Sequence, residues 1–315
     1  RKIGLPLHEA ILQRPNCTKI FVEGFEIDSC VVKRAPILDG VCEITDGRLS
    51  GDVDYNFLPY EDTESIEEHR KRIIKEVLES DIDILINYLP VGSQKATEFW
   101  CEICLETGVS LANCIPVFIA SNPEWSSRFE EKGIPIIGDD MKSQFGASIL
   151  SQMFEELAIN RGHKMIRHVQ RNIGGNMDFK NMMDNNRIKS KKISKENVLK
   201  CVTDREHNPA EPHFVHAGPS EYIRCYNDNK HADFDIEMEG FMGSKVTLTA
   251  HLSVEDSPNS AGVVIDAVRF LMVARDRGMR GALCGASAYT QKTPPKNMTF
   301  DEAYKECEEL ARKKN

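Results

Sequence analysis

The stretch IDILINYLPVGSQKATEFWCEICLETGVSLANCIP, residues 82–116, decides the fold. It contains two short apolar runs, at 82–89 and 110–116, separated by a segment of helical character at 94–108. Continuous apolar runs of this length are typical of strands that are buried on both faces of a parallel sheet. Because a helix connects them, the two strands are predicted to be parallel and joined by a right-handed crossover.

The same alternation continues on both sides of this stretch. A helix is predicted at 65–78, and a further helix and strand are predicted at 125–133 and 134–140. The pattern indicates an α/β fold with a doubly wound parallel sheet. Ligands bind beyond the carboxyl ends of the strands in such a sheet. The polar strand ends that follow from this rule are 87–93, 113–122 and 138–146.

Composition limits the function. With 315 residues, the chain is long enough for two domains or for one α/β unit with an insertion. A formal net charge of -9 argues against a nucleic-acid-binding protein. Ten cysteines without a signal peptide predict free thiols in a reducing compartment, and no apolar run reaches the roughly 18 residues of a membrane span. We therefore expect a cytoplasmic protein that binds neither nucleic acid nor membranes.

Two groups of potential metal ligands give weak signals. Cys101 and Cys104 form a lone CxxC pair, which we interpret as buried helix packing, with a metal site as the alternative. His207, His213 and His216 lie in a polar segment that prolines interrupt, and no metal-binding spacing connects them. A surface loop is therefore predicted at 205–222, and no metal ligand is assigned.

The segment GDDMKSQFGASIL, residues 138–150, joins a strand end to a helix. Backbone N–H groups at a helix start, the hydroxyl of Ser143 and the small Gly146 would form a seat for an anion. An ordinary N-cap, in which an Asp or Ser side chain satisfies the first turn, is the alternative.

A second polar segment, NIGGNMDFKNMMDNNRIKSKKISK, covers residues 172–195. It combines a predicted glycine turn at Gly174 and Gly175 with a run rich in lysine. Lys191 and Lys195 are four residues apart, so on a helix both ammonium groups would lie on one face and repel each other unless an anion lay between them. A phosphorylated substrate would be such an anion, and a solvated basic face is the alternative.

The pattern of polar and apolar residues changes after residue 162. Segments 163–175, 234–242 and 244–256 have mixed or alternating polarity, which favours an antiparallel sheet. A capped helix with an apolar face is predicted to begin near Asn259, and a charged helix is predicted to end the chain. We expect a dinucleotide-binding domain at 1–145, an inserted catalytic and tetramerisation domain at 146–256, and a segment at 257–315 that returns to the first domain.

Seven short motifs together resemble inositol-phosphate synthase in its shorter branch, and they occur in that family's order. They are LPVGS at 89–93, IPVFIAS at 115–121, GDDMKSQ at 138–144, NIGGNMDF at 172–179, SKKISK at 190–195, EDSPNSAG at 255–262 and SAYTQKTPP at 287–295. The resemblance implies a Rossmann-type domain that binds NAD, an inserted domain on an open sheet, and a homotetramer. It also implies the conversion of glucose 6-phosphate to inositol phosphate by oxidation at carbon 5, enolisation, aldol cyclisation and reduction.

The resemblance assigns site residues in three groups, which we carry over motif by motif. The catalytic group is Lys191, Lys230, Lys292, Asp140, Asp178 and Asp256. The substrate-binding group is Lys195, Ser143, Gln144, Gly146, Asn172 and Asn176. The cofactor-binding group is Asn87, Leu89, Pro90, Asp139, Asn259 and Ser260. Within them, Lys191 would exchange the proton at the carbon 5 oxygen, and the aspartates would orient the lysines and offset their mutual repulsion.

One part of the family pattern does not occur in this sequence. The family begins with a strand, a glycine loop and a second strand that ends in an acidic residue, and these hold the dinucleotide. We expect the chain to belong to a longer protein, and a variant that does not hold NAD normally is the alternative. The family pattern also often includes a divalent or monovalent cation near the phosphate, for which this sequence gives no assignable ligands.

Two other functions remain open at this point. An NAD(P)-linked dehydrogenase of another phosphorylated substrate would use the same fold and the same basic residues. A non-catalytic homologue would bind a sugar phosphate without converting it. Formation of NADH distinguishes the first from the cyclase, and turnover distinguishes the second.

Overall fold

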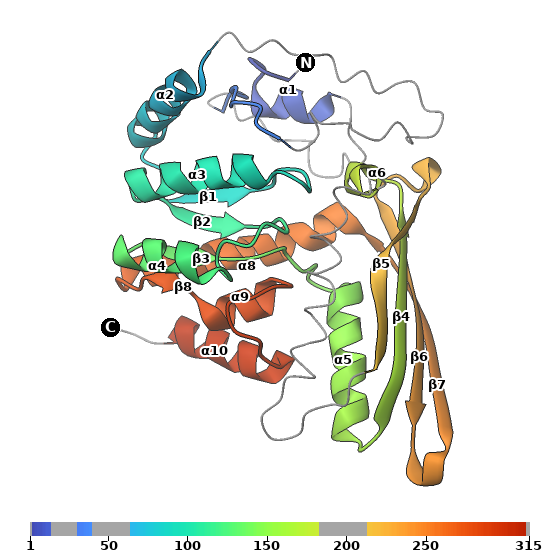
Figure 1. Cartoon of the computed structure of the whole chain (residues 1–315). Helices are drawn as coiled ribbons and strands as arrows, with labels where there is room; N and C mark the ends of the chain where they lie inside the picture. Colours follow the sequence, from blue (N-terminus) through green and yellow to red (C-terminus); the bar gives the residue numbers. More distant parts are fainter. Residues whose placement is uncertain (1, 14–29, 40–63, 183–212, 313–315) are drawn as a thin grey trace.

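The computed structural model describes residues 2–13, 30–39, 64–182 and 213–312. It contains two four-stranded sheets (Figure 1). None of the described helices is long and apolar enough to cross a membrane. The predicted site residues Lys191 and Lys195 lie outside the described residues, and so does His207.

The first sheet is parallel throughout, as predicted. Its order is β1 (Ile84–Asn87), β2 (Ser110–Asn113), β3 (Pro135–Ile137) and β8 (Gly281–Ala282). The register pairs Asn87 with Asn113, so the carboxyl ends of β1 and β2 meet at one edge. Together with its helices, this sheet gives the expected mixed α/β arrangement of Rossmann type.

Helices cover both faces of the first sheet. Leu111 and Ile136 pack with α3 (Gln94–Thr107) and α4 (Pro123–Glu131). Their neighbours Ala112 and Ile137 point the other way, because successive side chains of a strand alternate between faces, and they pack with α8 (Asp256–Asp276), α9 (Cys284–Thr290) and α10 (Phe300–Arg312). Two-sided burial explains why β2 and β3 read as uninterrupted apolar runs, whereas β1 at the edge of the sheet is less buried.

The remaining helices of this part follow local sequence signals. Helix α2 (Ile66–Glu79) begins at a capping box in which Ser65 and Glu68 satisfy each other's backbone N–H groups. A short helix, α1 (Leu7–Leu12), lies near the start of the described chain. Cys101 and Cys104 are free and buried in α3, which confirms the interpretation of the CxxC pair as helix packing.

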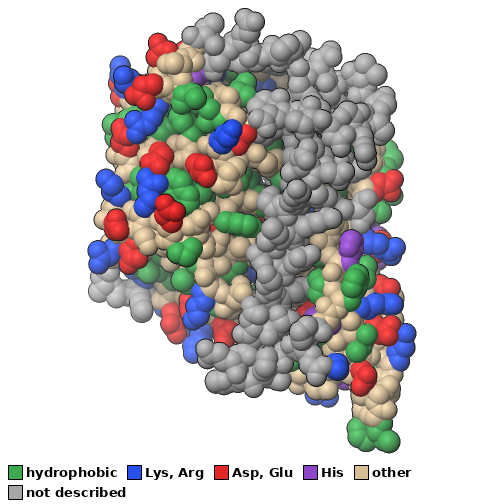
Figure 2. Space-filling model, viewed as in Figure 1, with side chains coloured by type: hydrophobic (Ala, Val, Ile, Leu, Met, Phe, Trp, Pro, Cys, Tyr) green, Lys and Arg blue, Asp and Glu red, His purple; other side chains and the backbone are tan. Residues whose placement is uncertain are grey.

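The second sheet has the order β5 (Phe214–Tyr222), β4 (Lys164–Gly174), β6 (Asn229–Glu239) and β7 (Lys245–Glu255). Helix α5 (Ala147–Asn160) packs on it, α6 (Met177–Asn181) follows β4, and the 3-10 turns Arg224–Tyr226 and Phe241–Gly243 connect its later strands. Figure 2 shows hydrophobic side chains at the far end of the β6–β7 hairpin, where Phe241 and Met242 are 87% and 89% exposed.

Four predictions about this second half need correction. The surface loop predicted at 205–222 is wrong where it is described, because Phe214–Tyr222 forms a strand parallel to β4, which makes the sheet mixed. His213 is not at the surface: its side chain is 2% exposed and contacts Glu155. Helix α8 begins at Asp256 instead of near Asn259. Gly174 ends a strand instead of making a turn, and a Cβ there would lie 2.6 Å from the ring of Phe179.

The packing of α8 leads to a stability prediction. Leu271 is 0% exposed between the first sheet and α9, so Leu271→Ala should lower the free energy of unfolding by about 3 kcal/mol. Ile265 lies on the same helix and is 60% exposed, so Ile265→Ala should change it by less than about 0.5 kcal/mol. Urea denaturation of the two variants measures both values, and equal losses would contradict the assigned face of α8.

Candidate functional site

A row of three buried polar side chains crosses the carboxyl edge of the first sheet. Asn87 ends β1, Asn113 ends β2, and Asp139 follows β3. The Asn87 amide donates to Asn113 Oδ1 at 2.9 Å, and the Asn113 amide donates to Asp139 Oδ1 at 2.7 Å. Buried polar groups need such partners, so the row fixes the relative positions of the three strand ends.

Asp139 also holds the loop that follows β2. Its carboxylate accepts hydrogen bonds from the backbone N–H groups of Ile119, Ala120 and Ser121 at 2.9, 3.1 and 3.0 Å. The Ser121 hydroxyl donates a further bond at 2.7 Å. Burial raises the pKa of Asp139 to about 6, although these donors lower it. At neutral pH the carboxylate is therefore ionised and can accept all of these bonds.

The chain just after Asp139 pairs with the segment that carries Lys292. Backbone bonds join Asp139 to Thr293 in both directions at 2.9 and 3.0 Å, and the Lys292 N–H donates to the Asp140 carbonyl at 2.7 Å. Asp140 has a φ of 60°, which turns the chain at this point. As a result, Lys292 Nζ lies 3.1 Å from Asp140 Oδ1, with the two side chains 12% and 1% exposed.

The next residues of this loop rest on the first turns of α8. The amide of Asn259 makes two bonds to the backbone of Phe145, donating to its carbonyl at 2.6 Å and accepting from its N–H at 3.1 Å. A Cβ on Gly262 would lie 2.0 Å from the side-chain oxygen of Gln144. The glycine therefore allows the predicted anion-binding loop to approach α8.

A second lysine is presented by the other sheet. Lys230 on β6 lies 3.0 Å from Asp256 Oδ1, at the start of α8. Asn176 donates to Asp256 Oδ2 at 3.2 Å and to Asp228 Oδ1 at 3.4 Å, and its own oxygen caps α6. Asp228 in turn accepts from the N–H and hydroxyl of Ser257 at 3.0 and 2.7 Å. These contacts join the ends of β4 and β6 to α8.

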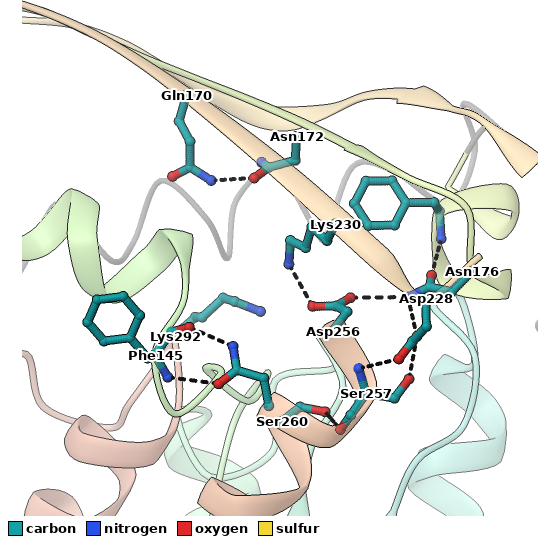
Figure 3. Close-up of polar contacts among 12 residues, drawn as sticks. Phe145, Gln170, Asn172, Asn176, Asp228, Lys230, Asp256, Ser257, Ser260 and Lys292 are labelled. Carbon is teal, nitrogen blue, oxygen red and sulfur yellow. Dashed lines mark hydrogen bonds and ion pairs between the residues drawn. The ribbon is translucent and has the colours of Figure 1, made fainter. Parts of the chain in front are cut away.

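The two ion pairs face each other, and we call Lys230, Asp256, Lys292 and Asp140 the lysine–aspartate cluster. Figure 3 shows the side chain of Lys292 pointing toward the Lys230–Asp256 pair. Burial raises the pKa of Asp256, but the ammonium of Lys230, the Asn176 amide and the charge of Lys292 bring it below its ordinary value. The charge of Asp256 therefore interacts with both lysines, one from β6 and one from the segment that follows α9.

The other predicted site residues have these positions. Leu89 is half-buried and Pro90 is exposed after β1, and the Leu89 N–H donates to Asn87 Oδ1 at 3.1 Å. Gly146 precedes α5, and a Cβ there would lie 2.8 Å from the Cβ of Ser143. Asp178 lies in the first turn of α6, and the Ser260 hydroxyl donates to the Ser257 carbonyl at 2.9 Å. Their roles toward substrate or cofactor stay predictions.

Sequence reasoning missed two residues that shape this site. Asp228 is buried and connects Asn176 to Ser257. Its position two residues before the predicted catalytic Lys230 could have identified it as a site residue. Lys142 is 5% exposed, and its ammonium donates to the carbonyl of Ala288 in α9 at 2.7 Å. A lysine in a predicted anion-binding loop suggests a ligand contact, so this internal role could not be predicted from the sequence.

The interactions of Asp139 predict a large effect for a small change. In Asp139→Asn, one carboxylate oxygen becomes an NH2 group, which cannot accept a hydrogen bond. Asn113 donates to Oδ1, and Ile119 and Ser121 donate to Oδ2, so either orientation of the new amide leaves a donor without its acceptor. We therefore expect the free energy of unfolding to fall by about 2 kcal/mol. Asp276 is exposed at the end of α8, so Asp276→Asn is the matched control and should change little. Chemical denaturation provides the comparison, and a loss no larger than in the control would show that Asp139 does not hold the strand ends.

Comparison with known proteins gives the family. The family model of myo-inositol-1-phosphate synthase matches residues 146–257. The inositol-3-phosphate synthase of Mycolicibacterium smegmatis is 39% identical over 98% of this chain and 81% of its own length, and that of Corynebacterium glutamicum is 38% identical with the same coverage. The crystal structure of Ari2 is 28% identical, with a TM-score of 0.71 over 98% of this chain and 80% of its own. A myo-inositol-1-phosphate synthase-related protein from Thermotoga maritima shares the fold, with a TM-score of 0.80 over 98% of this chain and 83% of its own, at 23% identity. This chain belongs to the myo-inositol-1-phosphate synthase family.

Proposed function

We propose that this protein is an NAD-dependent isomerase that cyclises D-glucose 6-phosphate to 1D-myo-inositol 3-phosphate. Its relatives with 38–39% identity over nearly the whole chain include proteins named inositol-3-phosphate synthase. The observation that carries the proposal is the lysine–aspartate cluster, in which Lys230 from β6 pairs with Asp256 and Lys292 from the segment after α9 lies close enough for its charge to act on the same carboxylate.

The chemistry of the cyclisation suits such a cluster. An enolate and an aldol oxyanion both form along the way, and a positioned cation stabilises negative charge most where water is excluded. Lys230 and Lys292 are mostly buried, and each has a carboxylate oxygen within 3.1 Å of its ammonium group. Lys292 and Lys230 would then stabilise oxyanions of the substrate, while Asp140 and Asp256 hold the two ammonium groups in position.

The carboxyl edge of the first sheet fits a dinucleotide. Leu89 and Pro90 lie beyond the end of β1, at the edge where parallel α/β sheets bind such cofactors, and Asn87 and Asp139 fix that edge from inside. NAD, when bound, would accept a hydride from carbon 5 of the sugar and return it after ring closure. Asn259 and Ser260, at the start of α8, complete the proposed cofactor-binding group.

The balance of charge in the lysine–aspartate cluster suggests that the phosphate is bound by additional cations. Lys230 and Lys292 are matched by Asp140 and Asp256, and Asp228 adds a third carboxylate nearby. A phosphate dianion therefore needs further cations, and we assign these to Lys195 and Lys191, with Lys191 also exchanging the proton at the carbon 5 oxygen. Ser143, Gln144 and Gly146 would contribute the loop before α5. By family analogy we also propose a homotetramer in the cytoplasm.

The activity can be tested directly. Purified full-length protein incubated with glucose 6-phosphate and NAD should form an inositol phosphate, identified by chromatography and periodate oxidation, and NADH should not accumulate. Stoichiometric NADH would indicate a dehydrogenase instead, and sugar-phosphate binding without product would indicate a non-catalytic homologue. Either result with folded, NAD-bound protein would contradict the proposal.

The role of Lys230 gives a second prediction. Lys230→Met keeps the apolar stem but removes the ammonium, so kcat should fall on the order of 100-fold. Lys245 lies in the same sheet, is 64% exposed and pairs with Glu237 at 2.8 Å, so Lys245→Met should stay within about twofold of the unmodified protein. Steady-state kinetics of both variants give the comparison. Equal activities would remove Lys230 from the catalytic group.

A further inference from the structure

A line of buried polar side chains runs along β4 beneath α5 and ends at Asn172. Its members come from α5, from β4 and from the start of β5. In order they are His213, Glu155, His168, Ser151, Gln170 and Asn172. Of these, only Asn172 is among the substrate-binding residues that the family resemblance assigns. Phe234, Ala147 and Ala232 are buried beside the line, so it is surrounded by apolar packing in which hydrogen bonds are strong and unpaired groups costly.

The contacts are short and continuous. Glu155 Oε1 lies 2.9 Å from both His213 Nε2 and His168 Nδ1. His168 Nε2 lies 3.0 Å from the Ser151 hydroxyl, which donates to Gln170 Oε1 at 2.7 Å. The Gln170 amide donates to Asn172 Oδ1 at 2.9 Å, and the Asn172 amide donates to the Gly218 carbonyl at 2.9 Å.

The directions of the bonds between His168 and Gly218 follow from the last acceptor. A backbone carbonyl can only accept, so the Asn172 NH2 must face Gly218 and its oxygen must face Gln170. Gln170 then donates to Asn172 and accepts from Ser151. The Ser151 proton is thereby committed to Gln170, so its oxygen accepts from His168 Nε2.

The other end of the line is set by Glu155. Its Oε1 faces a ring nitrogen of each histidine at 2.9 Å, and a single proton on that oxygen could serve only one of them, so the geometry favours an ionised carboxylate that accepts from both. Burial raises the pKa of this carboxyl, but these two hydrogen bonds bring it below its ordinary value. His168 Nδ1 therefore donates to it, as His168 Nε2 donates to Ser151. With both ring nitrogens donating, His168 is an imidazolium paired with Glu155. Among the described residues, Glu155 and His213 are the titratable groups that face this ring from α5 and from the start of β5.

Asn172 is buried on β4, two residues before the position that pairs with Lys230 of the lysine–aspartate cluster. Gly174, two residues further along β4, pairs with Lys230 in the sheet register, which places Asn172 about 7 Å from that level along the strand. Figure 3 shows Asn172 and Gln170 on the same side of the sheet as Lys230. After its bonds to Gln170 and Gly218, the Asn172 amide keeps one N–H and one lone pair, and their directions are set by those two bonds.

We propose that His168, Ser151 and Gln170 form a buried positioning relay that fixes which way the Asn172 amide faces the sugar phosphate. Only the effect of the relay on the substrate rests on the proposed function. The direction in which each of its hydrogen bonds is donated is a property of the protein alone. Loss of the His168 proton would reverse the Ser151 hydroxyl and leave Gln170 without its donor. The proton on His168 is therefore coupled to the orientation of an amide three side chains away.

The first test removes the central hydroxyl. Ser151→Ala should lower kcat/KM for glucose 6-phosphate about tenfold, the effect of one lost hydrogen bond in positioning Asn172. Ser151→Thr keeps a hydroxyl and should restore activity to within about twofold. A purely structural role would lower the denaturation midpoint of Ser151→Ala without a rescue of kcat/KM by threonine, and that result would overturn the relay.

The second test replaces the donor in the hydrogen bond from Gln170 to Asn172 by an acceptor, with a side chain of the same shape. In Gln170→Glu the carboxylate accepts but cannot donate, so the Asn172 amide should turn and give up Gly218. We expect at least a tenfold loss of kcat/KM and a shift of the Asn172 side-chain NH2 resonance in protein labelled with nitrogen-15 at asparagine, assigned with Asn172→Asp. Gln13→Glu, at an exposed position after α1, is the matched control and should leave both unchanged.

Nitrogen-15 spectra of labelled histidine complete the test and need no turnover. His168 should show two protonated ring nitrogens in the unmodified protein, assigned with His168→Gln, and should lose this signature at neutral pH in Ser151→Ala. A neutral His168 in the unmodified protein, or an Asn172 resonance unchanged in Gln170→Glu, would overturn the relay. If the spectra agree but the unmodified protein forms no inositol phosphate, the relay stands and the proposed function fails.

Discussion

The carboxylate of Asp139 is the point on which the site depends. It joins the ends of three parallel strands through Asn113, holds the loop at 119–121 by four hydrogen bonds, and ties its backbone to Thr293. One residue further on, Asp140 meets Lys292. A buried carboxylate is stable only when its hydrogen bonds are satisfied, so the loops that satisfy it are drawn to one place.

The cluster also needs the second sheet. Lys230 is brought to α8 by β6, and Asn176 and Asp228 connect the end of β4 to the same helix turn. Each lysine is held by a carboxylate from another element, which offsets part of the cost of burying a charged side chain. Helix α8 thus packs its apolar face on the first sheet and presents Asp256 to the second, and this couples the two halves of the proposed active site.

The elements with local signals were predictable from the sequence. The capping box at Ser65 and Glu68 marked α2, and the apolar runs marked β1, β2 and β3 because both faces of the sheet are covered. Strand β5 was not predictable, because Gly218 and Pro219 are residues that usually interrupt strands and it is an edge strand held by pairing with β4. The start of α8 was placed too late because Pro258 and Asn259 resemble a cap, whereas tertiary contacts extend the helix to Asp256.

The sequence by itself determined the parallel α/β fold, the buried cysteines and the motifs that define the family, because these follow from hydrophobic periodicity and from residue order. It also identified Lys230, Lys292, Asp140 and Asp256 as separate residues. Only the tertiary structure decided that Lys230 pairs with Asp256 and Lys292 with Asp140, and that His213 and His168 share Glu155. Such pairings join residues up to 152 positions apart. They arise when strands and helices pack, and no local pattern encodes them.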